Sequence, residues 1–227
     1  MVFDSDQWIN MFLGRLIETF GDRLLFVGHT GSFARGEATE GSDIDINIVL
    51  NTLSMEDLAI YREMIRTMPE KEKACGFICG KDVMEAWPTH ELFQFTQGCK
   101  CLHGSLDGLI GAPTERDILE NIRNLTSSIY HQSSHTYVFT NNSKDSLNGL
   151  KDAYKTAFFV LQEWTYIREQ QYVPTKRELI EHLNGDDRKV LSICINWDSL
   201  AEDRKANPER YYSLLISWSG DMLQRVR

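Results

Sequence analysis

The hydrophobic positions in the first part of the chain change from a helical repeat to runs that are typical of strands. Over residues 6–20 the apolar side chains fall on one stripe, which predicts an amphipathic helix that ends at Gly21. The stripe comprises Trp8, Ile9, Phe12, Leu13, Leu16, Ile17 and Phe20. Residues 24–28 form an apolar run and residues 43–50 alternate polar with apolar positions, so both segments are predicted to be strands.

The alternation of helices and strands continues to about residue 112. Ser54 followed by Asp57 is typical of a helix start, and Pro69 is typical of a helix end. The predicted elements are a helix at 55–67, a strand at 74–79, short helices at 82–87 and 91–96, and an edge strand at 100–103. Residues 1–112 are therefore expected to form an α/β domain, a mixed sheet with flanking helices.

After Pro113 the pattern contains only helices. The predicted helices run from Thr114 to about 132, over 144–170, from Pro174 to about 185, over 186–196, and from Asn207 onward. Thr114 with Asp117 has the spacing of a capped helix start, and Pro208 suits the first turn of the last helix. Residues 113–227 are therefore expected to form a second domain, an all-α helical bundle.

Composition narrows the class of protein. The 227 residues carry a net charge of −9 without a run of basic residues, which argues against a long nucleic acid as substrate and favours a small or cationic one. No apolar run is long enough for a membrane span, and the N-terminus lacks the pattern of a signal peptide, so a cytoplasmic location is expected. The five cysteines fit no zinc spacing and are expected to be reduced thiols.

Asp43 and Asp45 form the most informative pair in the chain. In a strand, residues two apart share a face, so Asp43, Asp45 and Asn47 are expected on one side and the intervening isoleucines on the other. The isoleucines are Ile44, Ile46 and Ile48. Two carboxylates spaced about 6.6 Å along a strand can converge on a hard divalent cation.

A glycine-containing turn precedes this pair. Gly31 and Ser32 follow the apolar strand, and a glycine there allows the backbone amides to approach a phosphate closely. A phosphate-binding turn beside two carboxylates suits metal-assisted attack on a nucleotide. The alternative interpretation of the same residues is an acidic turn exposed to solvent.

These residues resemble the signature of the nucleotidyltransferase superfamily related to DNA polymerase beta, which is Gly-Ser, about ten residues, and then Asp-x-Asp. The matching segments are Gly31-Ser32 and Asp43-Ile44-Asp45. The fuller strings Gly-Ser-x-Ala-Arg-Gly and Gly-Ser-Asp-x-Asp resemble the small bacterial branch, which includes aminoglycoside nucleotidyltransferases and minimal nucleotidyltransferase antitoxins. The resemblance is strongest over residues 22–50.

The resemblance implies roles for residues around the motif. Gly31 and Ser32 would bind the triphosphate of an NTP, with ATP expected, and Asp43 and Asp45 would act as catalytic ligands of Mg²⁺. Ser42 would orient the start of the strand. Two interpretations of Arg35 stay open: it contacts the phosphates, or it forms a structural ion pair.

The resemblance also implies a third carboxylate from a later strand, and here the sequence departs from the family. The strand at 74–79 contains no acid, and the expected position falls near Cys75. Glu72 lies just before this strand and Asp82 just after it. Glu72 is the preferred candidate for the third catalytic acid, and the alternative is that both are ordinary surface acids.

Lys155 is a further candidate for the triphosphate, and the alternative is that it is solvated. The expected activity is transfer of a nucleoside monophosphate from an NTP to a hydroxyl of a small-molecule acceptor, such as an aminoglycoside-like compound, with release of pyrophosphate. The alternative is a nucleotide-sensing or partner-binding module with little turnover, or an antitoxin-like enzyme that modifies a protein. The helical half offers a face for a homodimer, but nothing in the sequence requires one.

Overall fold

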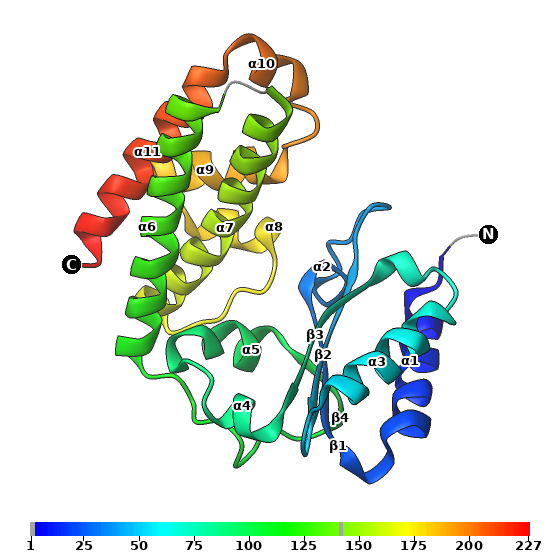
Figure 1. The fold of residues 1–227 in the computed structure, drawn as a ribbon. Coiled ribbons are helices and arrows are strands. Elements are labelled where there is room, and N and C mark those ends of the chain that lie inside the picture. The colour runs from blue at the N-terminus through cyan, green and yellow to red at the C-terminus, as the bar shows by residue number, and fades with distance from the viewer. Residues whose placement is uncertain (1–2, 141–142) are drawn as a thin grey trace. The chain divides into compact units, whose positions relative to one another are not determined.

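The structure, a computed structural model, describes residues 3–140 and 143–227, with side chains described for 3–140 and 148–227. The chain divides into two compact units, Met1–Ala112 and Pro113–Arg227. The first unit contains the helices α1 (Ser5–Phe20), α2 (Gly31–Arg35), α3 (Met55–Arg66), α4 (Lys81–Glu85) and α5 (Leu92–Gly98) and the strands β1 (Leu24–Thr30), β2 (Ile44–Leu50), β3 (Ala74–Gly80) and β4 (Lys100–Gly104). The expected α/β fold with a mixed sheet is confirmed (Figure 1).

The four strands lie in the order β3-β2-β1-β4. Strand β1 runs antiparallel to both β2 and β4, whereas β2 and β3 are parallel. The end of β1 therefore lies beside the beginnings of β2 and β4, and the beginning of β3 lies beside that of β2. Four chain segments meet at this edge of the sheet, which is also where the aspartate pair begins.

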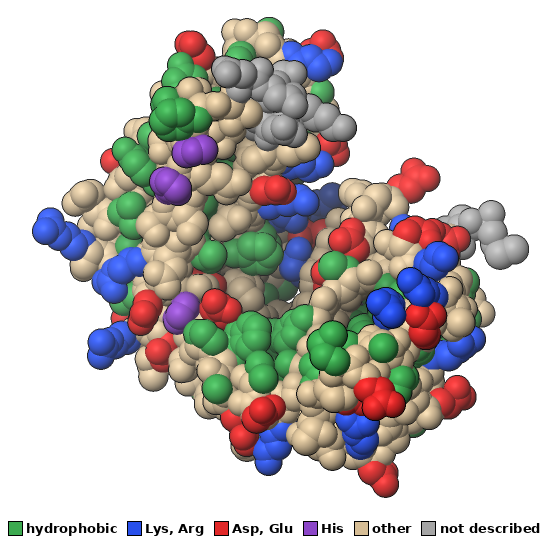
Figure 2. Space-filling model, viewed as in Figure 1, with side chains coloured by type: hydrophobic (Ala, Val, Ile, Leu, Met, Phe, Trp, Pro, Cys, Tyr) green, Lys and Arg blue, Asp and Glu red, His purple; other side chains and the backbone are tan. Residues whose placement is uncertain are grey.

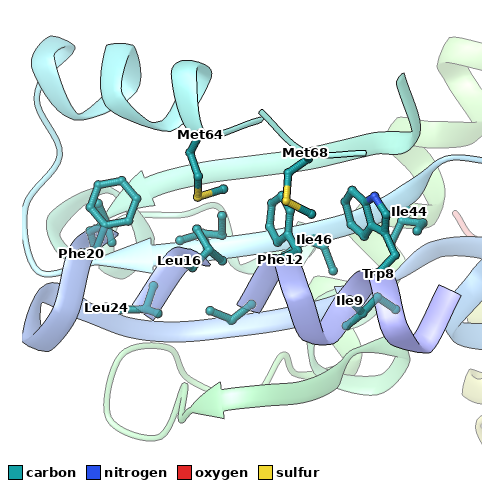
Figure 3. Close-up of a cluster of buried hydrophobic side chains, with 13 residues drawn as sticks. Trp8, Ile9, Phe12, Leu16, Phe20, Leu24, Ile44, Ile46, Met64 and Met68 are labelled. Carbon is teal, nitrogen blue, oxygen red and sulfur yellow. The ribbon is translucent and has the colours of Figure 1, made fainter. Parts of the chain in front are cut away.

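Two layers of apolar side chains hold this sheet. On one face, the stripe of α1 packs on the isoleucines of β2, and Met64 of α3 closes the same cluster (Figure 3). On the other face, Phe26 and Val49 of the sheet pack against Met84 of α4 and Leu92 of α5. Because side chains alternate along β2, its isoleucines point into the α1 layer, and Asp45 and Asn47 point to the opposite face.

The second unit is helical, as expected. Its helices are α6 (Glu115–Phe139), α7 (Ser143–Glu169), α8 (Lys176–Leu179), α9 (Gly185–Ile195), α10 (Ala201–Ala206) and α11 (Pro208–Arg225). Helix α6 packs against α7 and α11, and α9 packs against the same two helices. Buried polar pairs join these helices: the Asn121 amide donates to the Glu163 carboxylate at 2.8 Å, and the Trp218 indole donates to Asp187 at 2.7 Å.

Several element bounds differ from those expected. Helix α6 continues to Phe139 rather than ending near residue 132, since Ser133 is buried within the bundle and packing extends the helix through a polar segment. Helix α10 was not expected, because six residues are too few to show a helical repeat. The expected third helix is a single turn of α-helix, α8, continued by a 3₁₀ turn at Ile180–His182.

The surface carries both signs of charge. Figure 2 shows Lys and Arg side chains interspersed with Asp and Glu side chains on the face in view. Among the described residues, no helix combines the length and the apolar character needed to cross a membrane.

Candidate active site

The turn at Gly31 lies directly against the Asp45 side chain. Thr30, the last residue of β1, is the cross-strand partner of Asp45 on β2. Gly31 follows with φ of +75°, and a Cβ atom there would fall 1.8 Å from Oδ2 of Asp45. Only glycine therefore fits, both because the backbone is left-handed and because the carboxylate occupies the space of a side chain.

The residues after Gly31 present backbone amides beside this carboxylate. Helix α2 begins at Gly31, and the first amides of a helix have no acceptor within the helix. Two backbone bonds close the segment: the Gly36 amide donates to the Phe33 carbonyl at 3.1 Å and the Glu37 amide donates to the Ser32 carbonyl at 2.9 Å. The carbonyls of this turn are thus engaged inside the protein, and its leading amides are suited to an anion.

Asp43 and Asp45 stand at the beginning of β2. Asp43 is exposed just before the strand, and Asp45 is half-buried within it. Asn47, two residues further on, is buried, and its amide donates to the Thr30 hydroxyl at 2.9 Å. That bond links β2 to the end of β1 on the same face, so it holds the Gly31 turn and Asp45 in register.

The loop that carries Asp43 is fixed from two sides. The Ser42 hydroxyl accepts a bond from the Thr39 amide at 2.8 Å, which closes a tight turn before Asp43. The Lys73 ammonium, just before β3, donates to the Glu40 carbonyl at 2.9 Å. Lys73 was not among the expected site residues, and local sequence gives no sign of it, because the contact spans two strands of the sheet.

Arg35 forms an ion pair with Glu37, with 3.2 Å between Nε and Oε2. Both side chains are largely shielded from solvent, with exposed fractions of 14% and 16%. The structure therefore contains the ion pair that was one of the two interpretations of this arginine. A contact of Arg35 with phosphates remains a prediction.

Cys75 holds the position beside Asp45 on the neighbouring strand. The two residues are paired in the parallel register of β2 and β3, so their side chains lie beside each other on one face of the sheet. Burial raises the pKa of the Cys75 thiol, and the charges of Asp45 and Asp43 add to the rise. The thiol is therefore protonated at neutral pH and retains a proton that it could donate.

The two candidates for a third acid lie on either side of β3. Glu72 is exposed in a 3₁₀ turn at Lys71–Lys73, before β3 begins. Asp82 lies in α4, beyond Gly80, which pairs with the far end of β2. The catalytic role of Glu72 stays a prediction. Lys155 is exposed on α7 in the second unit, and its contact with the triphosphate also stays a prediction.

The carboxylates were tested for their fit to a divalent cation. Among the residues that the structure describes, no group of three or more His, Cys, Asp and Glu side chains could hold a metal. Mg²⁺ commonly takes one or two carboxylates together with substrate phosphates and water. The hard oxygens of Asp43 and Asp45, next to a turn suited to phosphates, fit an ion that arrives with a nucleotide.

Part of the first unit is similar to a known protein family. Residues 10–82 match the family model described as "Nucleotidyltransferase domain". This part of the chain is therefore similar to nucleotidyltransferase domains. The match includes the Gly31 turn, both aspartates and Cys75, so the candidate site lies entirely within the matched residues.

The fold of the whole chain resembles that of an adenyltransferase. A crystal structure of spectinomycin adenyltransferase AAD(9) from Enterococcus faecialis, with ATP and spectinomycin, aligns with a TM-score of 0.61 and 14% sequence identity. The alignment covers 96% of this chain and 99% of the other. No curated protein matches the sequence. The similarity therefore includes the helical unit. At 14% sequence identity it is a similarity of fold alone.

Proposed function

We propose that this protein is a metal-dependent nucleotidyltransferase that moves a nucleoside monophosphate from an NTP, with ATP expected, to a hydroxyl of a small-molecule acceptor. The observation that carries the proposal is the position of Asp45 against the Gly31 turn, where a Cβ would lie 1.8 Å from the carboxylate. That arrangement supports the proposal, because backbone amides suited to phosphates lie beside carboxylate oxygens suited to a metal ion, within the matched residues.

Each part of the site has a task in this reaction. The amides of the Gly31 turn bind the outer phosphates and orient the α-phosphorus. Asp43 and Asp45 would hold Mg²⁺, which would supply positive charge against the phosphate oxygens. The acceptor oxygen bonds to the α-phosphorus, the bond to the bridging oxygen breaks, pyrophosphate leaves and the hydroxyl proton passes to water. Asn47 keeps the turn and the strand in register through Thr30.

The acceptor is proposed to be small and cationic. The net charge of −9 favours a cationic molecule over a polyanion. The adenyltransferase with the similar fold was solved with spectinomycin, which makes aminoglycoside-like compounds the first acceptors to test.

A second function, a nucleotide-binding module with little turnover, is favoured by one observation. Cys75 rather than a carboxylate lies beside Asp45, so this edge of the sheet lacks an evident base for the acceptor hydroxyl. An antitoxin-like enzyme that modifies a protein hydroxyl would use the same nucleotide site with another acceptor.

Pyrophosphate release tests the transferase. Purified protein would be incubated with ATP and Mg²⁺ and a panel that contains spectinomycin, other aminoglycoside-like compounds and proteins. Acceptor-dependent release is expected, and Asp45→Asn should lower its rate by about 100-fold or more, since a bound metal contributes several kcal/mol to the transition state. Asp22→Asn, an exposed aspartate at η1 (Gly21–Arg23), is the matched control and should retain the rate. Mg²⁺-dependent ATP binding without release for any acceptor would favour the binding module.

A further inference from the structure

The thiol of Cys75 is placed at the metal–nucleotide site by the sheet itself. Neighbouring strands lie about 4.8 Å apart, so residues in register on one face are in side-chain contact. Cys75 is in register with Asp45, and the pKa of its thiol is raised by burial, which is the larger cause, and by the charges of Asp45 and Asp43. It is also exposed, so the thiol stands at the surface where a nucleotide would arrive.

The backbone after Cys75 has an unusual conformation that sets this placement. Gly76 has φ of +114°, and a Cβ there would fall 1.9 Å from the Ile46 carbonyl oxygen. Only glycine tolerates both the conformation and the close approach of the two strands. The start of β3 is therefore built to lie tightly against β2 at the residue that follows the thiol.

We infer that Cys75 is a positioning residue, whose thiol donates a hydrogen bond to Asp45 and so orients this carboxylate for the metal ion that accompanies the nucleotide. The inference rests on the proposed metal–nucleotide site. An ionised carboxylate only accepts hydrogen bonds, so the shared proton belongs to the sulfur. The thiol restrains the carboxylate without adding a charge.

In other proteins, hydrogen bonds to metal-binding carboxylates measurably increase metal affinity or activity. Loss of such an outer partner commonly weakens metal affinity or activity by about 10- to 100-fold. A thiol is a weak donor, so an effect at the lower end of this range is expected for Cys75. The effect should fall on the metal-bound nucleotide, because the Gly31 turn binds phosphates without help from Asp45.

Calorimetric titration of Cys75→Ala and Cys75→Ser tests the inference. Each protein would be titrated with ATP in Mg²⁺ and with ATP in EDTA. Cys75→Ala should weaken MgATP binding by about 10-fold and leave metal-free ATP binding within about twofold. Cys75→Ser, which restores a donor, should bind MgATP within about threefold of the wild type. Cys101→Ala is the matched control, because Cys101 is likewise exposed but its thiol donates to the Gly104 carbonyl on β4.

The outcomes separate this inference from the proposed function. If wild-type protein binds MgATP, Asp45→Asn does not, and Cys75→Ala binds as the wild type does, the positioning role is overturned while the site stands. Equal weakening in Cys75→Ala and Cys75→Ser also overturns it, since the donor would then be irrelevant. Equal loss of metal-free ATP binding in Cys75→Ala would show a general disturbance and likewise overturn it. If the wild type and Asp45→Asn both fail to bind MgATP, the metal–nucleotide site itself is absent and the inference falls with it.

Discussion

At the scale of single residues, the site depends on the absence of a side chain at Gly31. The carboxylate of Asp45 occupies the volume that a Cβ would need, and φ of +75° is a backbone conformation that other residues rarely adopt. Turn and carboxylate are thus in contact because one residue is glycine.

Gly31→Ala should therefore damage stability and binding together. The left-handed backbone alone costs about 1–2 kcal/mol for alanine, and displacement of Asp45 should lower MgATP affinity by about 10-fold or more. Gly108→Ala is the matched control, since Gly108 has φ of +78° but nothing within 4 Å of a Cβ. Urea unfolding and calorimetry would measure both variants. MgATP affinity in Gly31→Ala equal to that in Gly108→Ala would contradict the account.

At the scale of elements, caps and ion pairs of buried aspartates fix where helices begin and how they pack. The capping box of α3 pairs Ser54 with Asp57, and Arg23 donates to the same carboxylate at 2.8 Å. In the second unit, Asp187 of α9 accepts from Trp218 at 2.7 Å and pairs with Arg225 of α11 at 2.8 Å. Through these hydrogen bonds and ion pairs, each aspartate links its helix to a residue far away in the sequence of the same unit.

The stability of the first unit should depend on pH through Asp57. The hydrogen bond from Arg23, followed by those from Ser54, holds the pKa of Asp57 well below its usual range. A depressed folded-state pKa stabilises the protein above the unfolded pKa of about 3.9, and this contribution is lost as the pH falls below it. The difference in urea midpoint between wild type and Asp57→Asn should therefore be constant from about pH 5 to 7 and shrink below about pH 4.

Glu56→Gln, in the same first turn of α3, is the control for this titration. Glu56 is exposed, so its substitution should change the midpoint little at any of these pH values. A wild-type advantage over Asp57→Asn that stayed unchanged down to pH 2 would contradict the linkage.

Substitution of two neighbouring aspartates in α9 should change the free energy of unfolding by very different amounts. The Asp187 side chain is 10% exposed and pairs with Arg225, whereas that of Asp186 is 47% exposed and pairs with Lys189. Asp187→Ala leaves the buried indole of Trp218 without its acceptor and removes the ion-pair partner of the partly exposed Arg225, so a loss of about 1–3 kcal/mol is expected. Asp186→Ala should cost about 0–1 kcal/mol. Similar unfolding free energies for the two variants, measured by urea denaturation, would exclude a structural role for the Asp187 contacts.

What the sequence predicted was mostly local. The helix of residues 5–20, the strands and the contact of a glycine turn with an aspartate follow from hydrophobic repeats and from residues close in the chain. Lys73 and Cys75 act across strands, and the parallel register of β2 and β3 that places them depends on the packing of the whole sheet. Helix α6 continues beyond its expected end because of long-range packing as well. Ser133 is buried by the other helices of the bundle, which the local pattern of polar residues does not indicate.

At the scale of the whole molecule, the chain consists of two compact units, each with buried side chains of its own. The first unit has two apolar layers on its sheet, and the second has a helical core that includes Leu161 and Leu215. The proposed nucleotide site draws on Gly31, Asp43 and Asp45, all in the first unit.

The second unit should fold on its own. A fragment of residues 113–227 buries its own apolar side chains, so it should give a helical circular dichroism spectrum and a cooperative thermal transition. A full-length protein with the destabilising Asp187→Ala substitution offers a comparison, because the same substitution should lower the fragment's transition as well. A fragment without cooperative unfolding would show that its core depends on the rest of the chain.

The central claim is that Asp45, held against the Gly31 turn, binds a metal ion together with a nucleotide. Calorimetric titration of wild-type protein and Asp45→Asn with ATP, in Mg²⁺ and in EDTA, tests it most directly. The account predicts that Mg²⁺ strengthens ATP binding to the wild type, and that Asp45→Asn loses this gain while Asp22→Asn keeps it. Wild-type affinity that is the same with and without Mg²⁺, or an unchanged gain in Asp45→Asn, would contradict it.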